Sequence, residues 1–161
     1  MSESLWTDID NYLVTAITTD MGAASAYATL KLDQVVLSDS FQPDRYNPPT
    51  AIIFSNTARP IEQGPHADGE VHIYTEYRYF IAVIDNEQTT YAQGKANAQI
   101  LLQRVREVIR GRFALGGTTS TIGETVYETV IQEMRAEVLG GQLGGKFRGV
   151  GVVPIIIRTE I

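Results

Sequence analysis

The segment Gly140-Gly141-Gln142-Leu143-Gly144-Gly145-Lys146 has the residue types and spacing of a phosphate-binding loop, G-x-x-x-x-G-K. In such a loop the next residue is Ser or Thr, which reaches magnesium, and the loop opens a helix whose amides bind phosphate. Here the next residue is Phe147, and the residues after it predict a strand. We therefore interpret the segment as a hairpin connection and expect no nucleotide cofactor.

His66, Asp68 and His72 form the second group whose side chains could do chemistry, because imidazole and carboxylate groups are zinc ligands. His66 lies in a loop rich in proline and glycine, and His72 lies on the polar side of a predicted strand, so no helix fixes their spacing. We favour surface residues without a metal. The alternative of a different class is a small-ligand-binding protein or enzyme that uses these three residues, which predicts a pocket where they converge.

The sequence lacks the parts of a nucleophilic active site. It has no cysteine and no G-x-S-x-G sequence, and only two histidines could serve as the base. Glu124/Glu128 and Glu133/Glu137 are paired carboxylates, but a solvated face explains their regular spacing without acid–base work. We expect a protein that is not an enzyme, with no catalytic residue, metal or cofactor.

Arg104, Arg106, Arg110 and Arg112 gather near the end of a predicted helix. They could bind an anion. Positive charge also stabilises the negative C-terminal end of a helix, so we favour solvated helix-end charge or contact with an acidic neighbour.

Composition predicts one globular domain over residues 1–161. The chain is 43% hydrophobic and 20% charged, and it carries a net charge of −6. An acidic chain gains nothing from phosphate counterion release, so groove binding to nucleic acid is a poor expectation. The sequence has no apolar run of the ~18–20 residues that a membrane helix needs and no signal peptide at its start, so we expect a soluble, non-exported protein.

Two segments carry the expected fold. Odd positions from 71 to 83 are Val, Ile, Thr, Tyr, Tyr, Ile and Val, while His72, Glu76 and Arg78 occupy even positions, so this segment predicts a long strand with one apolar face. Residues 90–112 predict an amphipathic helix that Gly111 can end. Its apolar stripe consists of Gly94, Ala98, Leu101, Leu102, Val105, Val108 and Ile109.

The other expected elements complete an α+β fold: a mainly antiparallel sheet of about five strands with two helices packed on one face. In chain order they are a helix over 4–19, an extended segment over 26–37, a loop over 38–50, a strand over 51–55, a loop over 59–69, and a final strand over 147–161. Residues 124–139 fit a helical stripe, but their β-branched residues favour a strand, which we prefer.

The final strand is apolar on both faces yet contains Pro154, which cannot donate to a ladder. We therefore expect it at a sheet edge or at a bulge. An exposed apolar edge must be covered, either by a neighbouring subunit in a closed ring or by the chain's own loop 38–50. The expected subunit interface consists of Val150, Val152, Ile156 and Arg158, with Arg106 and Arg110.

The order of these elements resembles the tail-terminator and tail-completion (neck) proteins of tailed bacteriophages. The residues that carry the resemblance are 71–84 with 91–112, and then 132–161. Within the last of these, Glu137-Val138-Leu139-Gly140-Gly141 and Lys146-Phe147-Arg148-Gly149-Val150-Gly151-Val152 resemble the terminal hairpin of that family. The match covers most of the chain as a pattern of elements.

The resemblance implies a structural virion protein that is assembled in the host cytoplasm. Such proteins form a ring, typically a hexamer, at the head-proximal end of the tail tube, end tube growth and join tail to head. The implied partners are other copies of the chain, the tail-tube protein and head–tail connector proteins, with loops 38–50 and 59–69 as expected contacts. DNA would pass through the lumen without being held, for which an acidic chain is suited.

Overall fold

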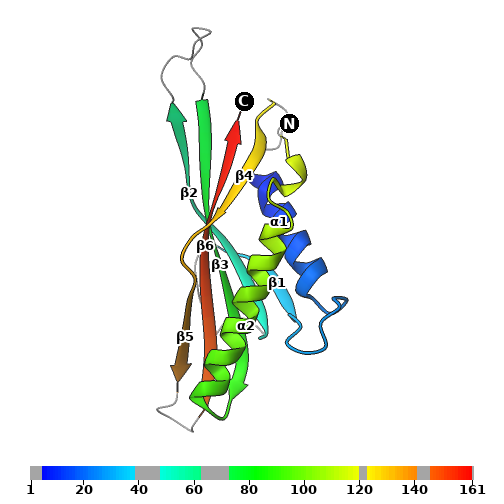
Figure 1. Cartoon of the computed structure of the whole chain (residues 1–161), viewed down its shortest axis with the longest axis vertical. Coiled ribbons are helices and arrows are strands. Elements are labelled where there is room, and N and C mark those ends of the chain that lie inside the picture. The colour runs from blue at the N-terminus through cyan, green and yellow to red at the C-terminus, as the bar shows by residue number, and fades with distance from the viewer. Residues whose placement is uncertain (1–4, 39–47, 63–72, 120–122, 141–145, 161) are drawn as a thin grey trace.

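The structure, a computed structural model, describes residues 5–38, 48–62, 73–119, 123–140 and 146–160. It is an α+β fold in which two helices cover one face of a mixed sheet (Figure 1). The α+β class and the two helices agree with the expectation from the sequence. The details of the sheet differ, and each difference has a local cause.

The helices begin and end close to their expected limits. α1 spans Leu5–Met21, and α2 spans Tyr91–Arg110. Thr90 caps α2, because its hydroxyl accepts a hydrogen bond from the Gln93 amide at 3.2 Å. Gly111 ends α2, as its spacing predicted, and its amide donates to the Glu107 carbonyl at 3.0 Å.

The sheet has six described strands, one more than expected, and they are β1 (Gln34–Leu37), β2 (Thr50–Glu62), β3 (Ile73–Gln88), β4 (Thr125–Ile131), β5 (Arg135–Gly140) and β6 (Phe147–Glu160). Their order is β1-β2-β3-β6-β4, and β5 also pairs with β6. β1 runs parallel to β2, whereas the other described pairs are antiparallel. The sheet is therefore mixed.

The predicted limits of the first two strands were wrong. The expected extended segment 26–37 forms a strand only from Gln34, because Leu30 has a φ of 55° and breaks the extended path. β2 continues to Glu62 through residues that we expected to form a loop. β1 pairs only with the first residues of β2, so Pro60 lies where β2 has no second described partner and needs no donor. The rest of the expected loop, 63–69, lies outside the described residues.

Residues 124–139 form strands, as preferred over a helix, but they form two. β4 and β5 pair in succession with the same long strand, β6. Between them, residues 132–134 leave the regular ladder, and the Gln132 amide donates to the Pro154 carbonyl at 2.9 Å.

The expected edge position of the last strand was wrong, because β6 lies between β3 and the two short strands β4 and β5. Pro154 is tolerated there for a local reason. In an antiparallel ladder the N–H and C=O of one residue point to the same neighbour. The Pro154 carbonyl binds Gln132, so its missing N–H faces the 132–134 break, where the ladder is already interrupted.

The main core lies between the helices and the sheet. The odd positions of β3 enter it, as the alternation predicted, with Tyr77, Tyr79, Ile81 and Val83 buried. The largest fully buried α1 and α2 side chains in this core are Ile9, Leu13, Ile17, Met21, Leu101 and Ile109.

α2 approaches β6 closely over two glycines. A Cβ atom at Gly149 would lie 2.9 Å from the Gly94 carbonyl carbon and nearer still to its oxygen. A Cβ atom at Gly151 would lie 2.5 to 2.8 Å from three carbons of the Leu102 side chain. At these two positions α2 can therefore come this close to β6 because the strand has no side chain there.

Candidate functional site

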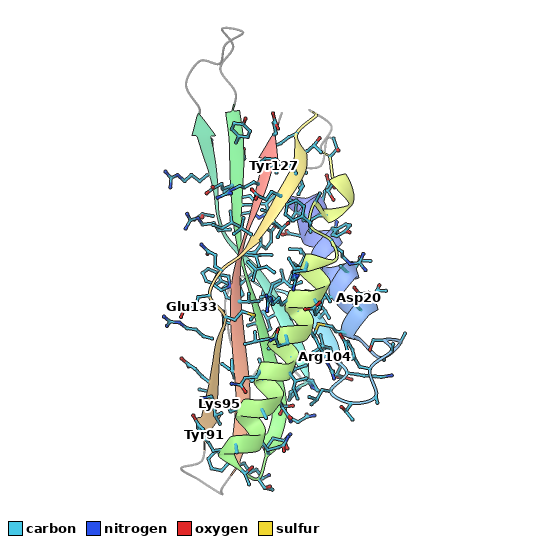
Figure 2. All side chains as sticks on the ribbon, in the orientation of Figure 1. Asp20, Tyr91, Lys95, Arg104, Tyr127 and Glu133 are labelled. Carbon is cyan, nitrogen blue, oxygen red and sulfur yellow. The ribbon has the colours of Figure 1, made fainter. Side chains whose placement is uncertain are left out.

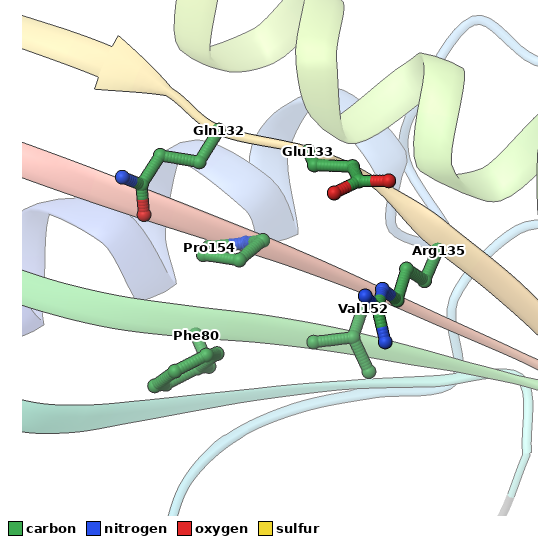
Figure 3. A pocket seen from close by; sticks show the side chains of 6 residues that line it. All are labelled: Phe80, Gln132, Glu133, Arg135, Val152 and Pro154. Carbon is green, nitrogen blue, oxygen red and sulfur yellow. The ribbon is translucent and has the colours of Figure 1, made fainter.

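The helix-free face of the sheet carries a hollow of about 500 Å³. Its floor comes from the centre of the sheet and its rim from the link between β4 and β5 (Figure 3). The lining residues are Phe80, Gln132, Glu133, Arg135, Val152 and Pro154.

The strand register explains why these residues meet. Phe80 pairs with Pro154 across β3 and β6, and its ring stacks on Phe54 of β2 with 5.3 Å between ring centroids. Val152 pairs with Arg135 across β6 and β5. Residues 132–134 do not form a regular strand, and the hollow lies beside this interruption between β4 and β5.

The described lining of the hollow combines an apolar floor with a polar rim. Phe80, Val152 and Pro154 give it an apolar floor, while Glu133 and Arg135 are exposed at the rim. Among the described residues, its lining contains no serine, threonine, cysteine or histidine. An apolar side chain of a partner, flanked by polar groups, fits this arrangement.

The expected interface residues of β6 lie on the same helix-free face but differ in accessibility. Val150 and Ile156 are 5% and 6% exposed, so this chain already covers them. Val152 is half-buried in the floor of the hollow. Because β6 is an interior strand, any subunit contact through Val152 would be made by its face and not by its edge.

Arg158 is held by two carboxylates on neighbouring strands. Its Nε donates to Glu76 at 3.2 Å, and its Nη1 donates to Glu128 at 2.9 Å. The bond to Glu128 is the largest cause that raises the pKa of Arg158. Glu76, which we expected to point outward on β3, is only 9% exposed. This network links β3, β6 and β4. The alternation of apolar and polar residues in the sequence does not reveal such contacts between strands.

The arginines near the end of α2 do not converge on one anion site. Arg104 donates to the carbonyls of Thr29 and Leu30 and lies 3.8 Å from the centroid of the Tyr27 ring. Arg112 binds Asp20 at 3.0 Å. Arg106 and Arg110 contact neither of these groups.

Arg106 and Arg110 remain interface predictions. Arg110 lies 3.8 Å from Glu107 as an exposed ion pair, which contributes little to stability. Arg106 is half-buried.

The structure describes the candidate acid–base residues but not the candidate metal ligands. His66, Asp68 and His72 lie outside the described residues, and the described residues contain no His, Cys, Asp and Glu cluster that could hold a metal. Glu124 is buried against Thr159 on the helix side, whereas Glu128 binds Arg158 on the opposite face. These two carboxylates therefore do not act as a pair.

A partly buried polar cluster beneath α1 was not predicted. The Tyr79 hydroxyl donates to Asp10 at 2.5 Å and lies 3.4 Å from the Trp6 carbonyl oxygen. Burial raises the pKa of Asp10 against the opposing effect of this bond, and burial with the Asp10 contact also raises the pKa of Tyr79. The only sequence signal was a tyrosine on the apolar side of a strand, which does not identify its partner.

Tyr77 predicts a loss of stability at alkaline pH. Burial, and then the charge of Glu124, raise the pKa of Tyr77 to about 12, above the unfolded value near 10. The folded state therefore keeps this proton more tightly, and the resulting stabilisation is complete below about pH 10 and is lost as the pH rises towards about 12. Two pKa units correspond to about 2 to 3 kcal/mol of unfolding free energy.

Urea unfolding followed at several pH values in this range measures that loss. Tyr77→Phe should reduce the slope of stability against pH. Equal slopes for the parent and the variant would show that Tyr77 does not titrate in this way.

The comparisons with known proteins add no family. No protein-family model matches the chain, and no curated protein matches its sequence. Among the described helices, neither is long and apolar enough to cross a membrane.

Proposed function

We propose that this chain is a structural virion subunit of a tailed bacteriophage: a tail terminator that forms a ring at the head-proximal end of the tail tube, ends tube growth and joins tail to head. The observation that carries the proposal is the hollow on the helix-free face, with its apolar floor of Phe80, Val152 and Pro154. The described helices pack on the other face, and on this one Phe80, Val152 and Pro154 are only half-buried among the described residues, so they can contact a neighbour.

The long strands support a structural role. β2, β3 and β6 are 13, 16 and 14 residues long, about 45 to 55 Å when extended, and they pair along most of that length. Proteins that join large assemblies need rigid surfaces of this kind, and residues on rigid elements keep their geometry on contact. The partners in this proposal are further copies of the chain, six in a closed ring, with the tail-tube protein and a head–tail connector protein.

The net charge of −6 supports the passage of DNA through such a ring, since an acidic wall does not hold phosphate. A head–tail connector or neck completion protein next to the terminator is the nearest alternative. The alternative of another class, a small-ligand-binding protein or enzyme with His66, Asp68 and His72, depends on residues outside the described part of the chain.

Ring assembly is tested by the mass of the protein in solution, measured by light scattering with and without purified tail-tube protein. We expect a mass of about six chains, either alone or on the tube. Val152→Lys places a second positive charge beside Arg135 in the floor of the hollow and should abolish the ring, because this charge repels Arg135 and would lose its water under a partner. Leu37→Lys, at a residue that is 46% exposed on β1, is the matched control and should assemble normally.

Thermal unfolding of both variants shows that they are folded. A strict monomer in both conditions would overturn the ring. Tube length, measured by electron microscopy during tube growth, separates the two virion roles: a terminator shortens the tubes, whereas a neck protein leaves their length unchanged.

A further inference from the structure

The two flanks of α2 differ in what they contact. Asn97 binds Asp85 of β3 at 2.8 Å, and Arg104 binds the backbone of Thr29 and Leu30. One flank of α2 therefore faces β3 and the segment before β1. Figure 2 shows Arg104 on this flank and Lys95 on the other, towards β5.

The flank towards β5 is basic. At about 100° per residue, positions 95, 99, 103, 106 and 110 fall on one stripe of α2. These residues are Lys95, Gln99, Gln103, Arg106 and Arg110, with no acidic residue among them. Neither Lys95 nor Arg106 has an ion-pair partner within the described residues. A concentration of positive charge on one stripe is notable in a chain whose net charge is −6.

Beside this flank, the edge of the sheet is open. Within the described part of the chain, β5 pairs with β6 and with no strand on its outer side. Met134, Ala136 and Val138 alternate with exposed polar residues and are half-buried on the helix side of this edge, with Val138 beside Gly94 of α2. An unpaired edge with half-buried apolar side chains is a template for another strand.

Together these features form a shelf, which we define by Lys95, Arg106, Met134, Ala136 and Val138. Its wall is the basic flank of α2, its floor is apolar, and its outer side offers unpaired backbone groups. Lys95 and Arg106 are about 17 Å apart along the helix, and a six-residue strand such as β5 extends about 20 Å. The wall and the edge therefore match in length.

We propose that this shelf binds an extended acidic segment of a partner protein, which adds to β5 as a further strand and pairs its carboxylates with Lys95 and Arg106. Backbone hydrogen bonds along β5 would give affinity, and alternate side chains would give specificity. Carboxylates belong on the helix side because that is where the free positive charge lies, and a basic segment would be repelled there.

This docking surface goes beyond the ring. It lies at a sheet edge and along α2, whereas the proposed ring contact lies in the hollow on the opposite face. The two proposals can therefore fail separately: the ring is measured by mass, and the shelf by protection of the β5 backbone.

The test uses an eight-residue peptide that alternates glutamate and valine, and a second peptide with lysine in place of glutamate. Binding to the full chain is measured by calorimetric titration, and hydrogen exchange of the Arg135–Gly140 amides reports where the peptide lies. We expect the acidic peptide to bind, to slow exchange along β5 and to weaken as salt is raised. The basic peptide should not bind.

Lys95→Glu with Arg106→Glu should lower the affinity for the acidic peptide at least about tenfold, since two attractive pairs become repulsive. The matched control is Lys31→Glu with Arg59→Glu, which makes the same change of net charge away from the shelf and should leave the affinity unchanged. If the glutamate double variant does not fold, Lys95→Gln with Arg106→Gln replaces it with the same direction of change.

Three results would overturn the proposal. The acidic peptide could fail to bind at millimolar concentration, or it could bind both double variants equally. In the third, the β5 amides would already be protected by self-association without peptide, which would assign the edge to a second copy of the chain.

Discussion

Replacing Gly149 with alanine is expected to lower the free energy of unfolding by about 3 kcal/mol. The new methyl group would meet the backbone of Gly94 and the Ala98 Cβ at 3.1 Å, and a helix backbone cannot rotate aside as a long side chain can. α2 would have to move away from β6, which loosens the contacts of the main core. In a chain of this size, such a change lowers the midpoint of thermal unfolding by about 6 to 12 °C.

Gly94→Ala is the matched control, because the same two glycines face each other. A Cβ atom at Gly94 would find its nearest neighbours at 3.5 Å, which is ordinary contact. Alanine also favours a helix over glycine by about 1 kcal/mol, so this variant should be as stable as the parent or more stable. Similar losses at both positions would show that α2 does not lie on β6 as described.

Replacing Arg158 with alanine is expected to cost about 2 kcal/mol, between the values of an exposed and a buried ion pair. The change leaves the carboxylates of Glu76 and Glu128 without the cation between them, and Glu76 is only 9% exposed. Arg78 also lies near Glu76, but at 4.0 Å its guanidinium is beyond hydrogen-bond distance. Urea unfolding gives the free energy directly.

Arg78→Ala is the control on the same face. Arg78 has an exposed side chain and only the long contact with Glu76, so we expect a cost below about 1 kcal/mol. The comparison also separates two roles for Arg158. A variant at Arg158 that keeps full stability but loses ring assembly would make this residue a subunit contact and contradict the internal role.

The sequence predicted well the long elements in which apolar residues recur at a regular spacing. α2 has an apolar stripe, a capping Thr90 and a terminating Gly111, and all three agree on its limits. The alternation in β3 likewise identified which side chains enter the core. In both elements the local preference and the tertiary packing have the same period, so the pattern was sufficient.

The errors arise where pairing, and not local preference, decides the structure. Pro154 argued for an edge, but whether its missing donor matters depends on the neighbouring strand, which is interrupted at 132–134. Pro60 argued for a loop, but it lies in β2 where no second described strand needs its donor. A proline in the sequence shows that a backbone N–H donor is missing. Only the fold shows whether a neighbouring strand has an acceptor at that position.

The candidate site was harder to predict than the fold. The hollow combines Phe80 with Val152, Pro154 and a link more than 50 residues away from Phe80, so no spacing in the sequence joins them. Val152 was named from its apolar strand and does line the hollow, but Val150 and Ile156 from the same strand are nearly covered. Alternation assigns a face to a residue, but it does not assign exposure.

The position of β6 has a consequence for how the protein is made. β6, which joins β3 to β4 and β5, is the last described strand to leave the ribosome. Phe80 can therefore pair with Pro154 only after the intervening residues have been synthesised. Until then β3 has one free side, with Tyr79 and Ile81 lacking part of their covering. Such non-local pairing slows folding and leaves an intermediate with exposed apolar surface that is prone to aggregation. Nascent chains stalled before residue 147 should therefore bind chaperones that recognise apolar strands, and release them when β6 is complete.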